Sequence, residues 1–255
     1  MTLLHIHYMG LMDFREVTIN TQTRLKERIQ QGDHDHLLLF HIQNHIATLG
    51  EATPPDKEQL VLKNPKIFDE VIRLTRGGSI TYHGPGQLIG YLIAKLDNFP
   101  PLPGSPTGQE RLPSHSTFDL QTRIEQGLLQ TTKALSIPDI YTVRDSFEMA
   151  DGRKKTQRAL FYKKGGSHAT GNHNKLAAIG IDTRGGITQH GFALNIEPIP
   201  QHYQESIIGC GLINVGTAAI NTIITPRKLT REQIYPILAE HLSQRLGYTG
   251  YVKNW

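Results

Sequence analysis

The sequence contains a single cysteine, and its neighbours favour chemistry at that position. Cys210 lies between two glycines in the segment Ile207–Leu212. A lone cysteine is usually a small buried hydrophobic residue. Here the flanking glycines leave the backbone bare, so that a substrate carbonyl can reach the sulfur and peptide N–H groups can stabilise an oxyanion. Cys210 is therefore a candidate nucleophile, provided that a base or a cation favours its thiolate form.

Lys175 is the candidate for that cation. It begins the otherwise apolar segment Lys175–Ile181, so its ammonium group is expected to project from a strand end into a pocket. The alternative is an ordinary strand-end lysine whose side chain reaches solvent. As a pair, the ammonium group would stabilise the thiolate, and the lysine would move protons once the thiolate charge is consumed.

The segment Arg76–Gln87, RGGSITYHGPGQ, is rich in both glycine and hydrogen-bonding groups. Its glycines let the backbone approach a ligand closely, while Arg76, Tyr82, His83 and Gln87 supply polar groups around the space. Such a segment is suited to form the wall of a substrate pocket. A glycine-rich β-hairpin with incidental polar residues is the alternative.

Two nucleotide-binding patterns and a metal site are disfavoured. GPGQLIG has the spacing G-x-G-x-x-x-G and precedes a β-rich run, unlike a dinucleotide-binding loop, and no G-x-x-x-x-G-K-[ST] occurs. Three histidine pairs have spacings that place both rings on one face of a strand or helix: His5 and His7, His34 and His36, and His41 and His45. Without a cysteine cluster or an H-E-x-x-H motif, we expect no metal site.

Hydrophobic periodicity predicts an α+β fold with a mixed, largely antiparallel sheet and flanking helices. Helical spacing covers Asp13–Gln31, Thr117–Leu135 and Thr230–Leu246. The predicted β regions are Leu3–Tyr8, His36–Leu49, Asp69–Leu74, Ser79–Tyr82, Gln87–Lys95, Ile140–Val143, Lys175–Ile181 and Gly191–Ile196. The proline-rich stretch after Asp97 predicts a surface loop, and Asp151–Asn174 predicts an exposed polar excursion.

The composition fits one domain spanning residues 1–255. Hydrophobic residues make up 38% and charged residues 20% of the chain, which excludes a disordered chain. No apolar run approaches the ~20 residues of a membrane span, and a single cysteine gives no reason to expect an oxidising compartment, so we expect a cytoplasmic protein. A net charge of +4, from scattered cations, suits an acidic protein partner better than nucleic acid.

Four motifs together resemble a known family. RGGSITYHGPGQLIGYLI, KLAAIGI, HGFALNI and Gly-Cys-Gly-Leu, in this order, resemble the octanoyl-acyl-carrier-protein:protein N-octanoyltransferases, also called lipoyl(octanoyl) transferases. The similarity extends from about Leu3 to about Leu246. It implies the fold of the lipoate and biotin protein ligase catalytic domain. It also implies transfer of an octanoyl group from octanoyl-acyl carrier protein to a lysine of a lipoyl domain, the first step of lipoate biosynthesis.

The resemblance also implies partners and residue roles. The acceptors would be the lipoyl domains of 2-oxoacid dehydrogenases and the glycine cleavage H-protein, with no cofactor and no nucleic-acid or membrane partner. Cys210 matches the nucleophile that carries the acyl group as a thioester, and Lys175 the residue that favours its thiolate. The implied substrate-binding residues are Arg76, Gly77, Gly78, Ser79, Ile80, Thr81, Tyr82 and His83, then Ala178, Ile179 and Gly180, and finally Gly191, Phe192 and Ala193.

Three features depart from the family pattern. Gly209 stands where proline is usual before the cysteine, and Ala159–Tyr162 replaces a Gly-Val-Trp-Val-like approach to the lysine strand. The segments near residues 98–116 and 151–174 are longer than is typical. These departures concern recognition of the carrier protein more than the chemistry.

Other functions remain open at this stage. An amidotransferase that moves octanoyl or lipoyl groups between lipoyl-carrying proteins would use the same cysteine and lysine with a different donor. An ATP-dependent lipoate ligase is disfavoured because it needs a nucleotide site and no cysteine nucleophile. A catalytically silent binding module would form no acyl-cysteine adduct.

Overall fold

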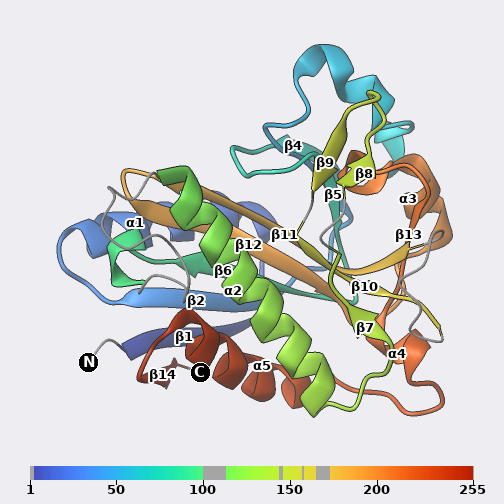
Figure 1. The fold of residues 1–255 in the computed structure, drawn as a ribbon. Coiled ribbons are helices and arrows are strands. Elements are labelled where there is room, and N and C mark those ends of the chain that lie inside the picture. Colours follow the sequence, from blue (N-terminus) through green and yellow to red (C-terminus); the bar gives the residue numbers. More distant parts are fainter. Residues whose placement is uncertain (1–2, 100–112, 144–145, 157, 165–172, 255) are drawn as a thin grey trace.

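A mixed β-sheet forms the centre of the molecule (Figure 1). The computed structural model describes residues 3–99, 113–143, 146–156, 158–164 and 173–254. The nine-stranded sheet has the order β14-β1-β2-β6-β12-β11-β10-β7, and β13 pairs with β11. Its strands are β1 (Leu3–Leu11), β2 (Asp35–His41), β6 (Gln87–Ile93), β7 (Ile140–Tyr141), β10 (Ala159–Tyr162), β11 (His173–Arg184), β12 (Ile187–Asn195), β13 (Val215–Thr217) and β14 (Gly250–Asn254).

Antiparallel pairing dominates this sheet. β2, β6, β12, β11, β10 and β7 pair antiparallel in turn, whereas β1 pairs parallel with β2 and β14, and β13 pairs parallel with β11. The predicted α+β class with a mixed, largely antiparallel sheet is confirmed.

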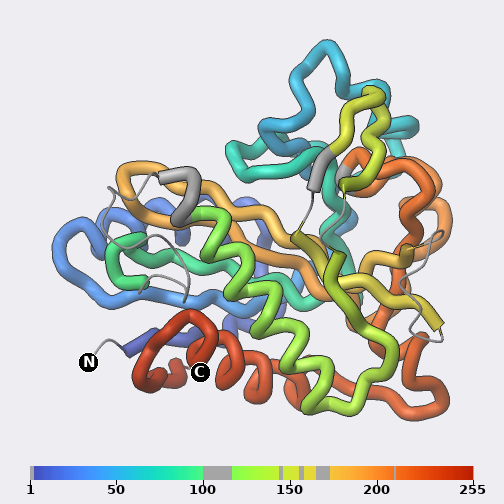
Figure 2. The backbone as a smooth tube through the Cα atoms, in the orientation of Figure 1, coloured from blue at the N-terminus to red at the C-terminus, as the bar shows by residue number. Residues whose placement is uncertain are grey.

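Helices cover both faces of the sheet. α2 (Pro113–Ala134) and α5 (Arg231–Leu246) pack against each other on one face, as Figures 1 and 2 show, where Leu128 and Leu238 join the largest hydrophobic core. α1 (Gln22–Gln30) continues from a π-helical turn (Glu16–Thr21) and contributes Ile29 to a second core that includes Phe40 of β2. The pattern over Asp13–Gln31 therefore correctly predicts a helix.

Smaller elements lie beside this layered body. β3 (Ile46–Leu49), β4 (Glu70–Arg73) and β5 (Ile80–His83) form a second sheet, and β8 (Ser146–Glu148) pairs with β9 (Lys154–Thr156). The remaining helices are α3 (Gln201–Ser206), α4 (Ile220–Ile223) and 3-10 turns at Pro55–Leu60, Pro65–Ile67, Leu96–Asn98 and Gly209–Gly211. The predicted β region His36–Leu49 is thus divided between two sheets.

The prediction of an exposed polar excursion over Asp151–Asn174 is wrong for residues 159–161. Ala159, Leu160 and Phe161 are fully buried in β10, between β7 and β11. A short apolar run flanked by polar residues suffices for a strand when neighbours cover both of its faces. Residues 165–172 and the predicted loop residues 100–112 lie outside the described part of the chain.

The C-terminal helix begins where the sequence predicts. Thr230 precedes α5, and the Gln233 side chain accepts a hydrogen bond from the Thr230 N–H at 2.9 Å. This contact satisfies one of the backbone donors that a helix leaves unpaired at its start. None of the helices in the described ranges is long and apolar enough to cross a membrane.

Candidate functional site

A β-bulge places Lys175 at the centre of the candidate site. In the pairing of β10 with β11, Leu160 lies opposite Ala177 but Phe161 lies opposite Lys175, so Leu176 is an extra residue. Leu176 and Ala177 both enter the main hydrophobic core. Simple alternation would place Lys175 and Ala177 on one face of the strand. The bulge instead brings Lys175 to the same cavity as Ala178.

The surroundings of Lys175 fix its backbone and bury its side chain. Its carbonyl oxygen accepts hydrogen bonds from the Ala218 N–H at 2.9 Å and from Asn195 Nδ2 at 3.3 Å. The residue is 7% exposed, and its Nζ lies 6.0 Å from the centre of the Phe161 ring. The ammonium group is thereby held at the end of a well-anchored strand segment.

A cavity of about 500 Å³ opens beside Lys175, and we call it the outer cavity. Its walls come from β5, β6, β11, β12, α3 and the segment 207–217. The residues that line it are Ile80, Thr81, Tyr82, Gln87, Lys175, Ala178, Ala193, Asn195, Ile199, Gln201, Gln204, Glu205, Ile207, Gly209, Val215, Gly216 and Thr217. Most of the lining carries no formal charge, which suits an apolar group with a polar head.

The segment that carries the cysteine lies at the edge of the outer cavity. Gly209–Gly211 forms a single 3-10 turn, in which the Gly211 N–H donates to the Ile208 carbonyl at 2.7 Å. The turn is anchored from outside because the Ala150 N–H donates to the Gly211 carbonyl at 2.7 Å. Gly209 lines the outer cavity, as Lys175 does. The backbone of Cys210 follows directly, while its side chain lies outside the described part of the structure.

A second, much smaller space continues from the outer cavity and is called here the inner cavity. Its volume is about 20 Å³, and it shares Thr81, Ala178 and Ala193 with the outer cavity. The other residues that line it are Arg76, Gly77, Gly78, His83, Tyr91, Ile179, Gly180, His190, Gly191 and Phe192. The two cavities together thus contain thirteen of the fourteen predicted substrate-binding residues.

Ser79 is the exception among these residues. Its hydroxyl pairs with that of Thr53 at 2.5 Å. A Cβ atom on Gly211 would lie 3.1 Å from Ser79 Oγ, so Ser79 supports the cysteine-bearing turn from beneath. Ser79 therefore contacts the cysteine-bearing turn, whereas the other residues of Arg76–His83 line the two cavities.

Asn195 belongs to the site but was not singled out from the sequence, whereas its buried partner Gln87 was named as a polar group of the glycine-rich segment. Gln87 Nε2 donates to Asn195 Oδ1 at 2.9 Å, and Asn195 Nδ2 donates in turn to the Lys175 carbonyl. Gln87 also accepts from the Gly84 N–H at 3.1 Å, which links the glycine-rich turn to the lysine strand. The signal was present, because Gln87 and Asn195 lie within the motifs GPGQ and HGFALNI.

Two histidines of the inner cavity are held neutral. Burial, with the nearby Arg76 guanidinium, lowers the pKa of His83 to about 3, and the same causes lower the pKa of His190 to about 3. Burial also raises the pKa of Tyr82 well above its usual value. Lys175 shares the wall of the outer cavity with Tyr82, whose hydroxyl is neutral near pH 7.

The described residues contain no group of three or more His, Cys, Asp or Glu side chains arranged to hold a metal ion. The candidate site thus consists of one buried lysine, a glycine-flanked cysteine backbone and a two-part cavity. Such a set can hold a thiolate beside a proton donor and bind an apolar acyl chain.

The fold is that of lipoate protein ligase catalytic domains. A bi-partite lipoate protein ligase from Thermoplasma acidophilum has the same fold, with a TM-score of 0.57 and 12% sequence identity, covering 100% of this chain and 88% of that one. A lipoate-protein ligase A solved with bound ATP gives a TM-score of 0.56 at 11% identity, covering 99% of this chain and 88% of that one.

The chain belongs to the lipoyl protein ligase A/B catalytic domain family, whose model matches residues 16–243. An octanoyltransferase from Corynebacterium diphtheriae is 28% identical over 92% of this chain and 80% of its own length. An octanoyltransferase from Clavibacter michiganensis subsp. michiganensis is 30% identical over 80% of this chain and 73% of its own length. The family predicted from the four motifs is confirmed.

Proposed function

We propose that this protein is an acyltransferase of lipoate biosynthesis that transfers an octanoyl group to the target lysine of lipoyl domains. The donor in this proposal is octanoyl-acyl carrier protein, and Cys210 and Lys175 form the catalytic pair. The likeness to octanoyltransferases over most of the chain supports the reaction. The observation that carries the catalytic pair is the bulge in β11, which brings Lys175 to the cavity that Gly209 also lines.

In the first half of the reaction, the Cys210 thiolate attacks the thioester carbonyl of the donor. The carbon–sulfur bond to Cys210 forms and the carbon–sulfur bond to the carrier breaks. The carrier thiol leaves with a proton from the Lys175 ammonium group, and the octanoyl group stays on the enzyme as a thioester. A thioester already stores the free energy needed for an amide, so the transfer requires no ATP.

In the second half, the amine of the acceptor lysine attacks the acyl-cysteine carbonyl. The amide bond forms, the bond to Cys210 breaks and the thiolate is restored. Lys175, neutral after the first half, accepts the proton that the amine gives up. The protein then returns to its starting protonation state, so that one lysine serves as acid and then as base.

The whole chain is proposed to act as one domain, residues 1–255. β14, next to the C-terminus, pairs with β1, next to the N-terminus, in the sheet that carries Lys175. Both ends of the described chain therefore stabilise the same sheet.

Intact-protein mass spectrometry tests the proposal. Incubation with octanoyl-acyl carrier protein is expected to add one octanoyl group to the wild type and none to Cys210→Ala, and added lipoyl domain is expected to remove it. No adduct on the wild type would overturn the covalent mechanism. A second donor, octanoylated H-protein, distinguishes the proposed transferase from an amidotransferase. An amidotransferase requires that octanoylated H-protein acylate Cys210 faster than octanoyl-acyl carrier protein does.

A further inference from the structure

The inner cavity ends in polar groups that the proposed reaction does not use. His83 and His190 both line it, and they are 5% and 4% exposed. Within the described ranges, the buried Nδ1 atoms of both rings lack a hydrogen-bond partner. Buried polar atoms without partners are costly, so two in one small cavity require an explanation.

The size of the cavity indicates what fits there. With a volume of about 20 Å³ the inner cavity has room for about one small group, and roughly 10–15 Å³ suffices for one water with two to four polar partners. Both rings are neutral near pH 7 because their pKa values are about 3. With the ring protons on the Nε2 atoms, each Nδ1 is an acceptor, and a water molecule has one O–H for each.

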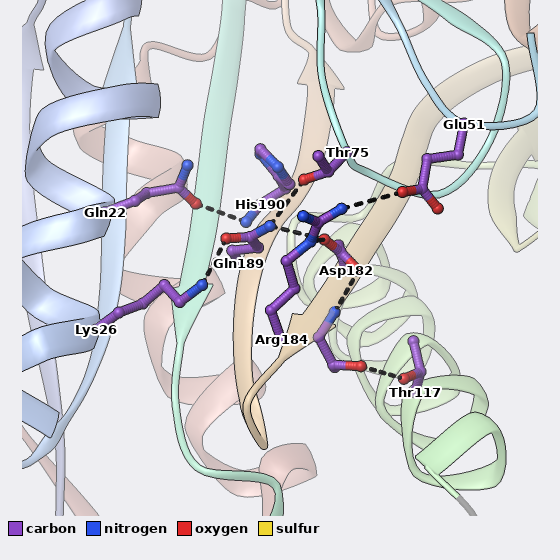
Figure 3. Close-up of polar contacts among 10 residues, drawn as sticks. Gln22, Lys26, Glu51, Thr75, Thr117, Asp182, Arg184, Gln189 and His190 are labelled. Carbon is purple, nitrogen blue, oxygen red and sulfur yellow. Dashed lines mark hydrogen bonds and ion pairs between the residues drawn. The ribbon is translucent and has the colours of Figure 1, made fainter. Parts of the chain in front are cut away.

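His190 is held rigidly in place. It has a positive φ of 64°, which is uncommon for a residue other than glycine. Its N–H donates to Gln22 Oε1 at 2.6 Å, as Figure 3 shows. The preceding Gln189 is itself held by Lys26 at 2.9 Å and by Asp182 at 2.7 Å. The backbone that carries the ring is thereby fixed, and the ring itself packs edge-to-face against Tyr91, with 5.6 Å between the ring centroids.

Further contacts in Figure 3 connect the β11–β12 hairpin to the segments that contain Glu51 and Thr75. Gln189 Nε2 donates to Thr75 Oγ1 at 2.9 Å, next to Arg76 in the chain. Arg184 bridges Asp182 at 3.0 Å and Glu51 at 3.2 Å. The hairpin of β11 and β12 and the Arg76 segment are thus fixed relative to each other, with the inner cavity between them.

We propose that His83 and His190 hold one ordered water molecule in the inner cavity and that this polar end wall sets the length of the acyl chain. This inference rests on the proposed octanoyl transfer and specifies how the site selects its substrate. A methyl end that displaces the water cannot replace its hydrogen bonds and leaves both imidazoles unsatisfied. A chain that stops short of the water incurs no such cost.

Competition between octanoyl- and decanoyl-acyl carrier protein for acylation of Cys210 tests the end wall. The wild type is expected to favour octanoyl by about tenfold or more, and His83→Leu, which removes one acceptor and makes the wall apolar, to reduce that preference about tenfold. His41→Leu is the matched control, because its Nδ1 is also buried and unpartnered among the described residues, but His41 lies outside the two cavities. Its octanoyl preference should equal that of the wild type.

A high-resolution crystal structure of the wild type provides a second measurement that does not depend on the variant folding. An ordered water within hydrogen-bond distance of both Nδ1 atoms supports the proposal, and a dry cavity overturns it. An unchanged preference in folded His83→Leu also overturns it while octanoyl transfer by the wild type stands. If the wild type takes up no octanoyl group at all, the proposed function fails instead.

Discussion

Lys175 combines two properties that rarely occur together in one lysine, because it is 7% exposed and yet lines a cavity. Burial of an ammonium group lowers the stability of the folded state unless a favourable contact compensates for the lost hydration. Here the Phe161 ring lies 6.0 Å from Nζ, within the range of a cation–π contact. At the scale of the residue, the proposed mechanism requires this cation to be held beside the cysteine-bearing turn.

Two substitutions of Lys175 separate its proposed roles. Lys175→Ala is expected to lower turnover by at least about 100-fold and to raise the pH at which iodoacetamide labels Cys210, because both the proton donor and the cation are lost. Lys175→Arg should preserve the labelling profile, because the cation remains, but not the turnover, because arginine does not release its proton. Equal turnover in Lys175→Arg and the wild type would contradict the role in proton transfer.

Asn195 is a positioning residue for Lys175. Asn195→Leu removes the hydrogen bonds to the Lys175 and Ala218 carbonyls and one of the two acceptors of Gln87 Nε2, which keeps its contact to the Tyr82 carbonyl. We expect kcat to fall about tenfold with little change in KM, and the free energy of unfolding to fall by about 1–3 kcal/mol. Steady-state kinetics and urea unfolding measure the two effects. A change confined to stability would show that Asn195 has only a structural role.

At the scale of elements, the central strands approach one another closely at glycines. A Cβ atom on Gly191 of β12 would lie 2.2 Å from the Gly90 carbonyl oxygen of β6. Because backbone atoms cannot move aside as a flexible side chain can, the strands would have to separate. The same strand segment carries Phe192 and Ala193 into the cavities, so the close approach also shapes the acyl site.

Gly191→Ala is therefore expected to reduce the free energy of unfolding by about 3 kcal/mol. Gly209→Ala is the matched control, since no heavy atom lies within 4 Å of the Cβ that it would add, and its effect should stay within about 0.5 kcal/mol. Chemical denaturation of both variants checks the difference. Similar losses in the two proteins would argue against close packing of β6 against β12.

At the scale of the whole molecule, exposed cations are expected to guide the acidic carrier protein that we propose as the donor. Arg153 is already paired with Asp151 at 2.6 Å, whereas Lys154 of β9 is exposed. Lys154→Glu should raise the KM for the carrier about two- to threefold at low salt and have a smaller effect at high salt, because salt screens exposed charges. Lys228→Glu, exposed near α4, is the control. Identical KM values for all three proteins would exclude the β8–β9 hairpin from docking.

Buried histidines make the stability of the protein sensitive to acid. Burial lowers the pKa of His36 to about 4, and its Nδ1 lies 3.0 Å from His7 Nε2. Because the unfolded histidine has a pKa near 6.5, the unfolded state binds more protons between pH 6.5 and 4, so stability falls as the pH falls through this window.

For His36 the loss is on the order of 3 kcal/mol across that window. Urea unfolding at several pH values from 7 to 4 measures it. His36→Gln should reduce the dependence on pH without abolishing it, because His83 and His190 contribute to the same window, while His202→Gln, at an exposed position, serves as the control. A wild-type free energy of unfolding that stays constant down to pH 4 would contradict the assignment of His36 as neutral.

Local sequence determined much of this protein. The spacing of apolar residues correctly predicts α2, α5 and most of the strands, since amphipathic periodicity is a local property. The glycine-rich and HGFALNI motifs likewise identify about half of the residues that line the two cavities. The single cysteine between glycines marks the candidate nucleophile without any structure.

The tertiary structure decided how these parts meet. Strict alternation along β11 would place Lys175 and Ala178 on opposite faces of the strand. The bulge that brings both to one cavity is defined by pairing with β10, and β10 was not predicted because polar residues flank it in the sequence. His83 and His190 share the inner cavity although they are far apart in the chain, because β12 and the Arg76–His83 segment both border it. Bulges and cavities arise from pairing and packing between distant segments, which no local pattern of residue types encodes.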